Sequence, residues 1–177
     1  MELTWYLPLS QWYWYDLEYW GLDYPPLTAY HSYLCGGLSH YLVGPETVAN
    51  DSSSRGYEDP VHKAFMRATV LVSDLFIYGT AVWAWSRRLT SKSSHILFAF
   101  AMMQPAIVLI DHGHFQYNTV ALGLSLWSFY YMTLSWKHCI VASILFCLAL
   151  SFKQMTLYYA PAVFFFLLGR CFETRTF

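Results

Sequence analysis

The densest group of reactive side chains in this chain is the run Asp111–Asn118, which reads Asp-His-Gly-His-Phe-Gln-Tyr-Asn. Apolar stretches flank this run at Ile96–Ile110 and Thr119–Trp136. Ionisable groups at the end of a membrane span are costly unless they face water, protein or a bound headgroup. The run is therefore the first candidate for a functional site.

Two other segments carry side chains of the same kinds, Gly21–Ser32 and the turn Phe152-Lys153-Gln154. Acids, amides and imidazoles beside aromatic rings are typical of a carbohydrate site, because sugar C–H faces stack on rings and hydroxyls hydrogen-bond to acids and amides. A cation such as Lys153 would neutralise a phosphate leaving group, and a carboxylate would act as general base. The polar set is Asp23, His31, Asp111, His112, His114, Gln116, Tyr117, Asn118, Lys153 and Gln154. The aromatic wall beside it is Trp12, Tyr13, Trp14, Tyr15, Tyr19, Trp20 and Tyr24.

Plainer interpretations exist for several of these residues. Trp and Tyr concentrate at membrane interfaces without any binding role. His112 and His114 fit a loop in which they hydrogen-bond to Asp111. A single His-x-His pair lacks the repeated histidine boxes of membrane oxygenases, so no metal site is expected.

Two isolated charges also have structural explanations. Asp74 follows Arg67 by seven residues on one helical face, which favours a structural ion pair or a polar contact with a neighbouring helix over catalysis. Lys153 lies near the end of a span and could simply extend its amine to the interface.

The composition predicts an all-α, polytopic membrane protein. Of the 177 residues, 56% are hydrophobic and 12% are charged, against about 25% charged in soluble domains. The predicted organisation is a luminal aromatic and acidic segment at 1–63, with a membrane or interfacial helix at 27–43, followed by a transmembrane region at 64–177. Five spans are predicted there: Ala68–Trp85, Ile96–Ile110, Thr119–Trp136, His138–Phe152 and Met155–Gly169. Pro105 and Pro161 lie inside spans and should kink them.

The basic residues predict the orientation. Five alternating spans place the gaps that contain Arg87, Lys137 and Arg170 on one side of the membrane, which the positive-inside rule makes cytosolic. The candidate site residues then face the opposite, luminal side. The sequon at Asn50 agrees with this orientation and is a predicted glycosylation site. The net charge of −1 offers no basic surface for nucleic acid.

Four segments, in order along the chain, resemble one enzyme family. They are Trp14–Ser32 with its Pro-Pro-Leu-Thr-Ala-Tyr-His run, Ser54–Glu58, Asp111–Asn118 and Phe152–Met155. Together they resemble the endoplasmic-reticulum dolichyl-phosphate-glucose-dependent α-1,3-glucosyltransferases, and among these the branch that adds the first glucose.

The resemblance implies a GT-C-type glycosyltransferase in the endoplasmic reticulum membrane. Such an enzyme transfers glucose from dolichyl phosphate glucose to a mannose of the nine-mannose, dolichyl-diphosphate-linked oligosaccharide, with inversion, on the luminal side. It implies no cofactor, because neither a metal nor a nucleotide is needed.

The resemblance also implies a partial chain with about five to six transmembrane helices. Met1–Thr4 is similar to residues just downstream of the family's Gly-Asp-aromatic-Glu motif, so the catalytic base is expected upstream of Met1 and no catalytic residue is assigned. Asp23 matches the second acid of the family's luminal site. The expected substrate-binding residues are Asp23, Tyr24, His112, His114, Gln116, Asn118, Lys153 and Gln154. The alternatives are a non-catalytic membrane protein that binds lipid-linked sugar or a partner and, ranked last, a small transporter.

Overall fold

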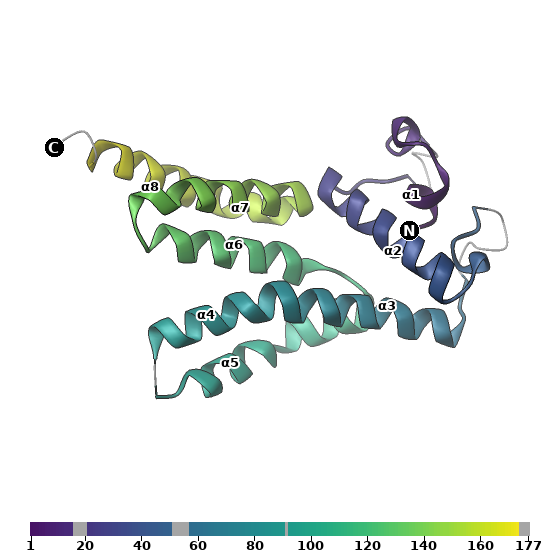
Figure 1. Cartoon of the computed structure of the whole chain (residues 1–177), viewed down its shortest axis with the longest axis horizontal. Coiled ribbons are helices and arrows are strands. Elements are labelled where there is room, and N and C mark those ends of the chain that lie inside the picture. The colour runs from purple at the N-terminus through teal and green to yellow at the C-terminus, as the bar shows by residue number, and fades with distance from the viewer. Residues whose placement is uncertain (16–20, 51–56, 91, 174–177) are drawn as a thin grey trace. The chain divides into compact units, whose positions relative to one another are not determined.

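The computed structural model describes residues 1–15, 21–50, 57–90 and 92–173, and within them the structured segments are helical (Figure 1). The chain divides into two compact units, Met1–Val72 and Ser73–Phe177, which are treated separately below. The predicted all-α class is confirmed for the described part of the chain. Tyr19 and Trp20 of the aromatic wall lie outside the described residues, as does Ser52 of the sequon.

The first unit is built around α2 (Pro26–Leu42), which begins at a proline in its first position, where the missing N–H costs nothing. The short α1 (Glu2–Tyr6) packs against α2. The indole ring of Trp5 in α1 packs on Gly36 and Gly37 of α2. The contact is so close that a Cβ at Gly37 would lie 2.7 Å from Cζ3 of Trp5. Glycine weakens a helix by about 1 kcal/mol relative to alanine, and here it allows close packing in return.

The unit ends with α3 (Pro60–Ser73), of which only Ser73 belongs to the second unit. The carboxylate of Asp59 accepts hydrogen bonds from the backbone N–H groups of Val61 and His62, at 2.8 and 2.9 Å. Asp before Pro is a helix-start signal for this reason.

The second unit is an array of antiparallel helices that Figure 1 shows from α4 to α8. They are α4 (Thr80–Leu89), α5 (Ser94–Met102), α6 (Asn118–Met132), α7 (Cys139–Phe152) and α8 (Ala160–Glu173). Two π-helical segments, Asp74–Gly79 and Ile107–Gly113, precede α4 and follow α5. Every segment predicted to span the membrane therefore contains a helix.

By length and composition, two helices in the described residues could cross a membrane, Pro60–Leu89 and Gln154–Glu173. A third candidate is the pair Ser94–Met102 and Ile107–Gly113, which is bent by 55°. The break between the two contains Pro105, so the predicted kink is confirmed there and has the usual cause, a missing backbone N–H. Pro161 lies in the first turn of α8, directly after the 3-10 segment Gln154–Tyr159, and a kink at Pro161 stays a prediction. The predicted total of five to six membrane helices stays a prediction.

Helix α6 is the centre of this unit, and small residues allow its neighbours to approach closely. A Cβ at Gly123 would lie 2.7 Å from the backbone nitrogen of Tyr78 in the first π-helical segment. On the α7 side, the hydroxyl of Ser128 donates to the carbonyl oxygen of Ala142 at 2.7 Å, and both residues are fully buried. Small residues and interhelical hydrogen bonds are the usual means by which helices associate in membranes.

Candidate functional site

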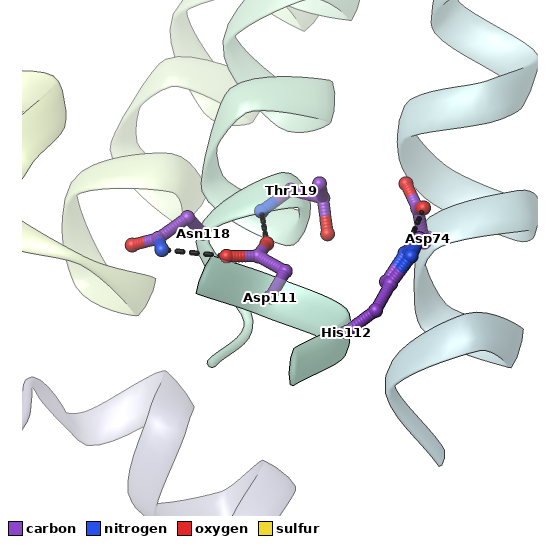
Figure 2. Close-up of polar contacts among 5 residues, drawn as sticks. All are labelled: Asp74, Asp111, His112, Asn118 and Thr119. Carbon is purple, nitrogen blue, oxygen red and sulfur yellow. Dashed lines mark hydrogen bonds and ion pairs between the residues drawn. The ribbon is translucent and has the colours of Figure 1, made fainter. Parts of the chain in front are cut away.

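The polar residues that contact one another in the second unit form a group that we call the polar cluster: Asp74, Asp111, His112, Gln116, Asn118, Thr119 and Lys153. The carboxylate of Asp111 is fully buried and makes two of these contacts. One oxygen accepts a hydrogen bond from Nδ2 of Asn118 at 2.6 Å, and the other accepts from the backbone N–H of Thr119 at 2.7 Å (Figure 2). Asn118 and Thr119 open α6, whose first N–H groups have no partner within the helix. The carboxylate therefore caps α6 from outside, at the end where a helix favours negative charge.

His112 points away from Asp111 and toward another helix (Figure 2). Its Nε2 donates to Oδ2 of Asp74 at 2.9 Å. The interpretation of His112 as a loop residue bonded to Asp111 is wrong, because His112 lies in the π-helical segment Ile107–Gly113 and its Nε2 bonds to Asp74 instead. The prediction that Asp74 makes a polar contact with a neighbouring helix is confirmed.

Both acids lie in π-helical segments, Asp74 at the start of one and Asp111 within the other. A π-helical turn inserts one extra residue, which changes the direction of the side chains that follow, and such turns are frequent at functional sites. The adjacent residues Asp111 and His112 serve different partners, with Asp111 directed at α6 and His112 at Asp74.

A chain of hydrogen bonds leads from Asp111 to Lys153, and we call it the polar chain. Nδ2 of Asn118 donates to Oε1 of Gln116 at 3.1 Å as well as to Asp111. The same Oε1 accepts from Nζ of Lys153 at 3.1 Å. The polar chain thus consists of Asp111, Asn118, Gln116 and Lys153, and its last link joins Gln116 and Lys153, which are 37 positions apart.

The turn before α6 is shaped to present Gln116. Phe115 has a φ of 58°, in the left-handed region that a bulky side chain rarely occupies. This conformation brings the backbone N–H of Gln116 to within 3.3 Å of the carbonyl oxygen of Asp111. A strained residue at such a position costs on the order of 1–3 kcal/mol and is characteristic of sites where geometry matters.

Burial lowers the pKa of the Lys153 amine below the ordinary lysine value, while the negative charge of Asp111 raises it and partly opposes that effect. Lys153 is half-buried in the turn between α7 and the next helical segment. A desolvated ammonium held by an amide oxygen is a suitable group to meet a phosphate.

Two polar atoms of the cluster are buried and have no hydrogen-bond partner among the described residues, Oδ1 of Asp74 and Oγ1 of Thr119. Buried carboxylate and hydroxyl oxygens normally have partners. The cluster therefore has capacity for further hydrogen bonds next to the His112 contact.

The structure brings together four of the predicted substrate-binding residues, with Gln116, Asn118 and Lys153 in the polar chain and His112 beside it. His114 and Gln154 are exposed. Asp23 and Tyr24 belong to the first unit and are exposed there, and the backbone oxygen of Tyr24 accepts from the hydroxyl of Tyr13 at 2.8 Å. Asn50 is exposed as well.

Two acids organise the cluster. Asp111 belongs to the predicted polar set but not to the expected substrate-binding residues, and Asp74 makes the structural contact that the sequence predicts. Their shared signal was an acid next to, or within, an apolar stretch. No group of three metal-ligating side chains occurs in the described parts of the chain.

The model of the ALG6, ALG8 glycosyltransferase family matches residues 1–177. A probable dolichyl pyrophosphate Man9GlcNAc2 alpha-1,3-glucosyltransferase of Schizosaccharomyces pombe is 48% identical over 99% of this chain and 35% of its own length. Two further relatives are named dolichyl pyrophosphate Man9GlcNAc2 alpha-1,3-glucosyltransferase. The protein of Mus musculus is 48% identical over 97% of this chain and 34% of its own length. The protein of Saccharomyces cerevisiae is 47% identical over 96% of this chain and 32% of its own length.

The chain spans about a third of the length of these relatives. The similarity covers both units and every segment of the polar cluster. The chain belongs to the ALG6, ALG8 glycosyltransferase family.

Proposed function

We propose that the protein containing this chain transfers glucose in α-1,3 linkage to the dolichyl-diphosphate-linked, nine-mannose oligosaccharide. The observation that carries the proposal is identity of 47–48% across nearly the whole chain with relatives that bear this enzyme name. The donor is dolichyl phosphate glucose, and the site lies on the luminal side of the endoplasmic reticulum membrane in a GT-C-type arrangement of about five to six helices.

In the reaction, the oxygen of a mannose hydroxyl bonds to C1 of glucose while the bond between C1 and the phosphate oxygen breaks. Attack from the face opposite the phosphate inverts the configuration at C1. The hydroxyl proton passes to a carboxylate, and dolichyl phosphate leaves with the bonding electron pair. The phosphate leaving group gains negative charge in this step, and a nearby cation would stabilise that charge.

Lys153 is the described residue best suited to be that cation. Its amine is held by Gln116, and Gln116 is in turn fixed by Asn118 and Asp111. Pre-positioned charge is effective because no reorganisation is required during the reaction. We assign Lys153 to the phosphate and the amides of Gln116 and Asn118 to its positioning.

The remaining predicted residues are assigned to the sugars. Asp23, with its exposed carboxylate, contacts the acceptor or donor hydroxyls, and Tyr24 offers a ring beside it. His112, His114 and Gln154 are assigned to further sugar hydroxyls. No catalytic base is assigned among the described residues.

The test is a transfer assay with the full gene product that contains this sequence, purified in detergent. Dolichyl phosphate glucose and the nine-mannose lipid-linked oligosaccharide are supplied, and the released glycan is analysed by mass and linkage. One added glucose in α-1,3 linkage is expected, with no loss of rate in EDTA and no product when UDP-glucose replaces the lipid donor. Binding of both substrates without product would instead support a non-catalytic protein that binds lipid-linked sugar.

A further inference from the structure

The first unit contains a surface pocket of about 530 Å³ that is distinct from the polar cluster. We call it the aromatic pocket. Rings dominate its lining, with the turn Leu7–Leu9 closing one edge. The aromatic residues are Trp5, Tyr6, Trp12, Tyr30 and Tyr33. Its volume lies within the range of small-molecule sites, about 300–1,000 Å³.

The rings are held in place by their own contacts. The indole N–H of Trp12 donates to the carbonyl oxygen of Leu7 at 3.0 Å, and the ring packs edge-on against Tyr30 with centroids 5.4 Å apart. Trp5 is seated over the glycines of α2 and packs against Tyr33, at 5.3 Å between centroids. The pocket wall is therefore pre-formed, so a ligand would not have to order it.

The chemistry of the lining selects a neutral, hydroxylated ligand. None of the lining residues carries a charged side chain. Tyr6, Tyr30 and Tyr33 are each at least 40% exposed, so part of each residue is accessible to a ligand. Aromatic faces suit the C–H surface of a hexose, while phenol hydroxyls both donate and accept hydrogen bonds.

The lining also excludes a role in the chemical step. A transfer site needs a carboxylate to take the hydroxyl proton and a cation to meet the phosphate. The aromatic pocket has neither among its lining residues. A ligand held here is bound for recognition.

We propose that the aromatic pocket binds a mannose unit of the acceptor oligosaccharide that is not the mannose receiving glucose. This inference rests on the proposed function, which supplies a large, neutral, mannose-rich acceptor. The pocket then discriminates the complete oligosaccharide from shorter precursors. An isoprenoid chain is the other occupant that rings could take, and the experiment separates the two.

The test compares KM and kcat of the full gene product and its variants Tyr30→Ala and Tyr6→Ala. Each variant is expected to raise KM for the nine-mannose acceptor by roughly five- to tenfold, the effect of losing one stacked ring. The values of kcat and of KM for dolichyl phosphate glucose should not change. Leu34→Ala, an exposed residue of α2 outside the pocket, is the matched control and should behave as wild type.

A second acceptor that lacks the branches not receiving glucose sharpens the result. It should bind wild type more weakly and be insensitive to the Tyr30 and Tyr6 substitutions. Tyr30→Phe keeps the ring and serves as the variant least disturbing to folding, and it should show a smaller rise in KM. A thermal melt of each variant checks that the protein remains folded.

Three results would overturn the inference. An unchanged acceptor KM in Tyr30→Ala and Tyr6→Ala excludes a sugar in the pocket, and a raised donor KM with an unchanged acceptor KM assigns the pocket to the isoprenoid chain. If wild type transfers no glucose at all, the proposed function fails first. In that case, quenching of tryptophan fluorescence by the lipid-free nine-mannose glycan still decides the pocket, and absence of quenching rejects it.

Discussion

The two units of this chain use polar and aromatic side chains in opposite ways. In the second unit Asp74 and Asp111 are almost fully buried and make hydrogen bonds to neighbouring side chains or backbone. In the first unit Asp23 and the tyrosines of the aromatic pocket are exposed, and rings provide the packing. The difference is that the second unit fixes its buried acids by hydrogen bonds, while the first unit leaves these side chains exposed at its surface.

The contrast predicts that the second unit tolerates little change at its centre. Gly123→Ala should be the most destabilising substitution, by about 3 kcal/mol or more, because the new Cβ would meet the backbone of Ile77 and Tyr78 at 2.7–2.8 Å. Thermal unfolding in detergent measures the effect. Gly169→Ala, in α8 with nothing within 4 Å, is the matched control and should be neutral or slightly stabilising. Equal effects of the two substitutions would contradict the close packing of α6.

The buried acids should differ from each other. Both carboxylate oxygens of Asp111 accept hydrogen bonds from N–H groups. Asp111→Asn replaces one of these oxygens by an amide nitrogen, which places two donors against each other. The substitution should lower the free energy of unfolding by about 2–3 kcal/mol. Asp74→Asn keeps one acceptor for His112 and places the amide nitrogen near no existing donor among the described residues, so it should cost about half as much. Denaturant unfolding in mixed micelles compares the two variants. A larger loss in Asp74→Asn would mean that the His112 contact, and not the cap of α6, holds the cluster together.

Part of this cluster was predictable from the sequence. The run Asp111–Asn118 stood out as polar groups between apolar stretches, and the Pro105 break follows from proline chemistry. The hydrogen-bond partners of the residues in this run could not be predicted from the sequence. The π-helical turn at Ile107–Gly113 changes the directions of the side chains, and such a turn is not visible in the hydrophobic pattern. The link from Gln116 to Lys153 depends on tertiary packing over 37 positions, which local spacing does not encode.

The aromatic pocket shows a different limit of prediction. The aromatic wall was visible as composition, but a similar excess marks any membrane interface. What distinguishes a pocket is the glycine pair that seats Trp5 and the N–H bond that fixes Trp12. The contact of Trp5 with the glycines depends on α1 and α2 meeting, and the bond from Trp12 to Leu7 depends on how the chain turns after α1, and both are seen only in the fold.

A pH dependence follows from Lys153. Burial lowers the pKa of the Lys153 amine. An exposed lysine has a pKa of about 10.4. As pH rises, Lys153 therefore loses its proton, and with it the positive charge, at a lower pH than an exposed lysine would. Transfer rates should therefore fall on the alkaline side earlier than for an enzyme that uses an exposed lysine. Lys153→Arg stays protonated and should flatten the alkaline limb of kcat/KM measured between about pH 7 and 10. An identical alkaline limb in wild type and Lys153→Arg would remove Lys153 from the titrating groups.

The smallest effect is expected at an exposed ion pair of the first unit. Lys63 lies 2.9 Å from Glu58, and this contact lowers the pKa of the Glu58 carboxyl. A carboxyl group whose pKa is lowered by folding stabilises the folded state at pH values above its ordinary pKa. This stabilisation is lost as the pH falls through the lowered pKa. Because Glu58 is fully exposed, solvent screens the pair, and Glu58→Gln should not measurably change the melting temperature at pH 7. A clear drop would show that the first unit depends on charge as the second does.

The role of Lys153 is tested most directly by single-turnover glucose transfer with the full gene product carrying Lys153→Met. If Lys153 meets the phosphate, the rate constant should fall by roughly tenfold or more, while Lys63→Met, an equal loss of charge in the exposed pair, should match wild type. A rate in Lys153→Met equal to that of wild type would contradict the assignment of the polar chain to the transfer site.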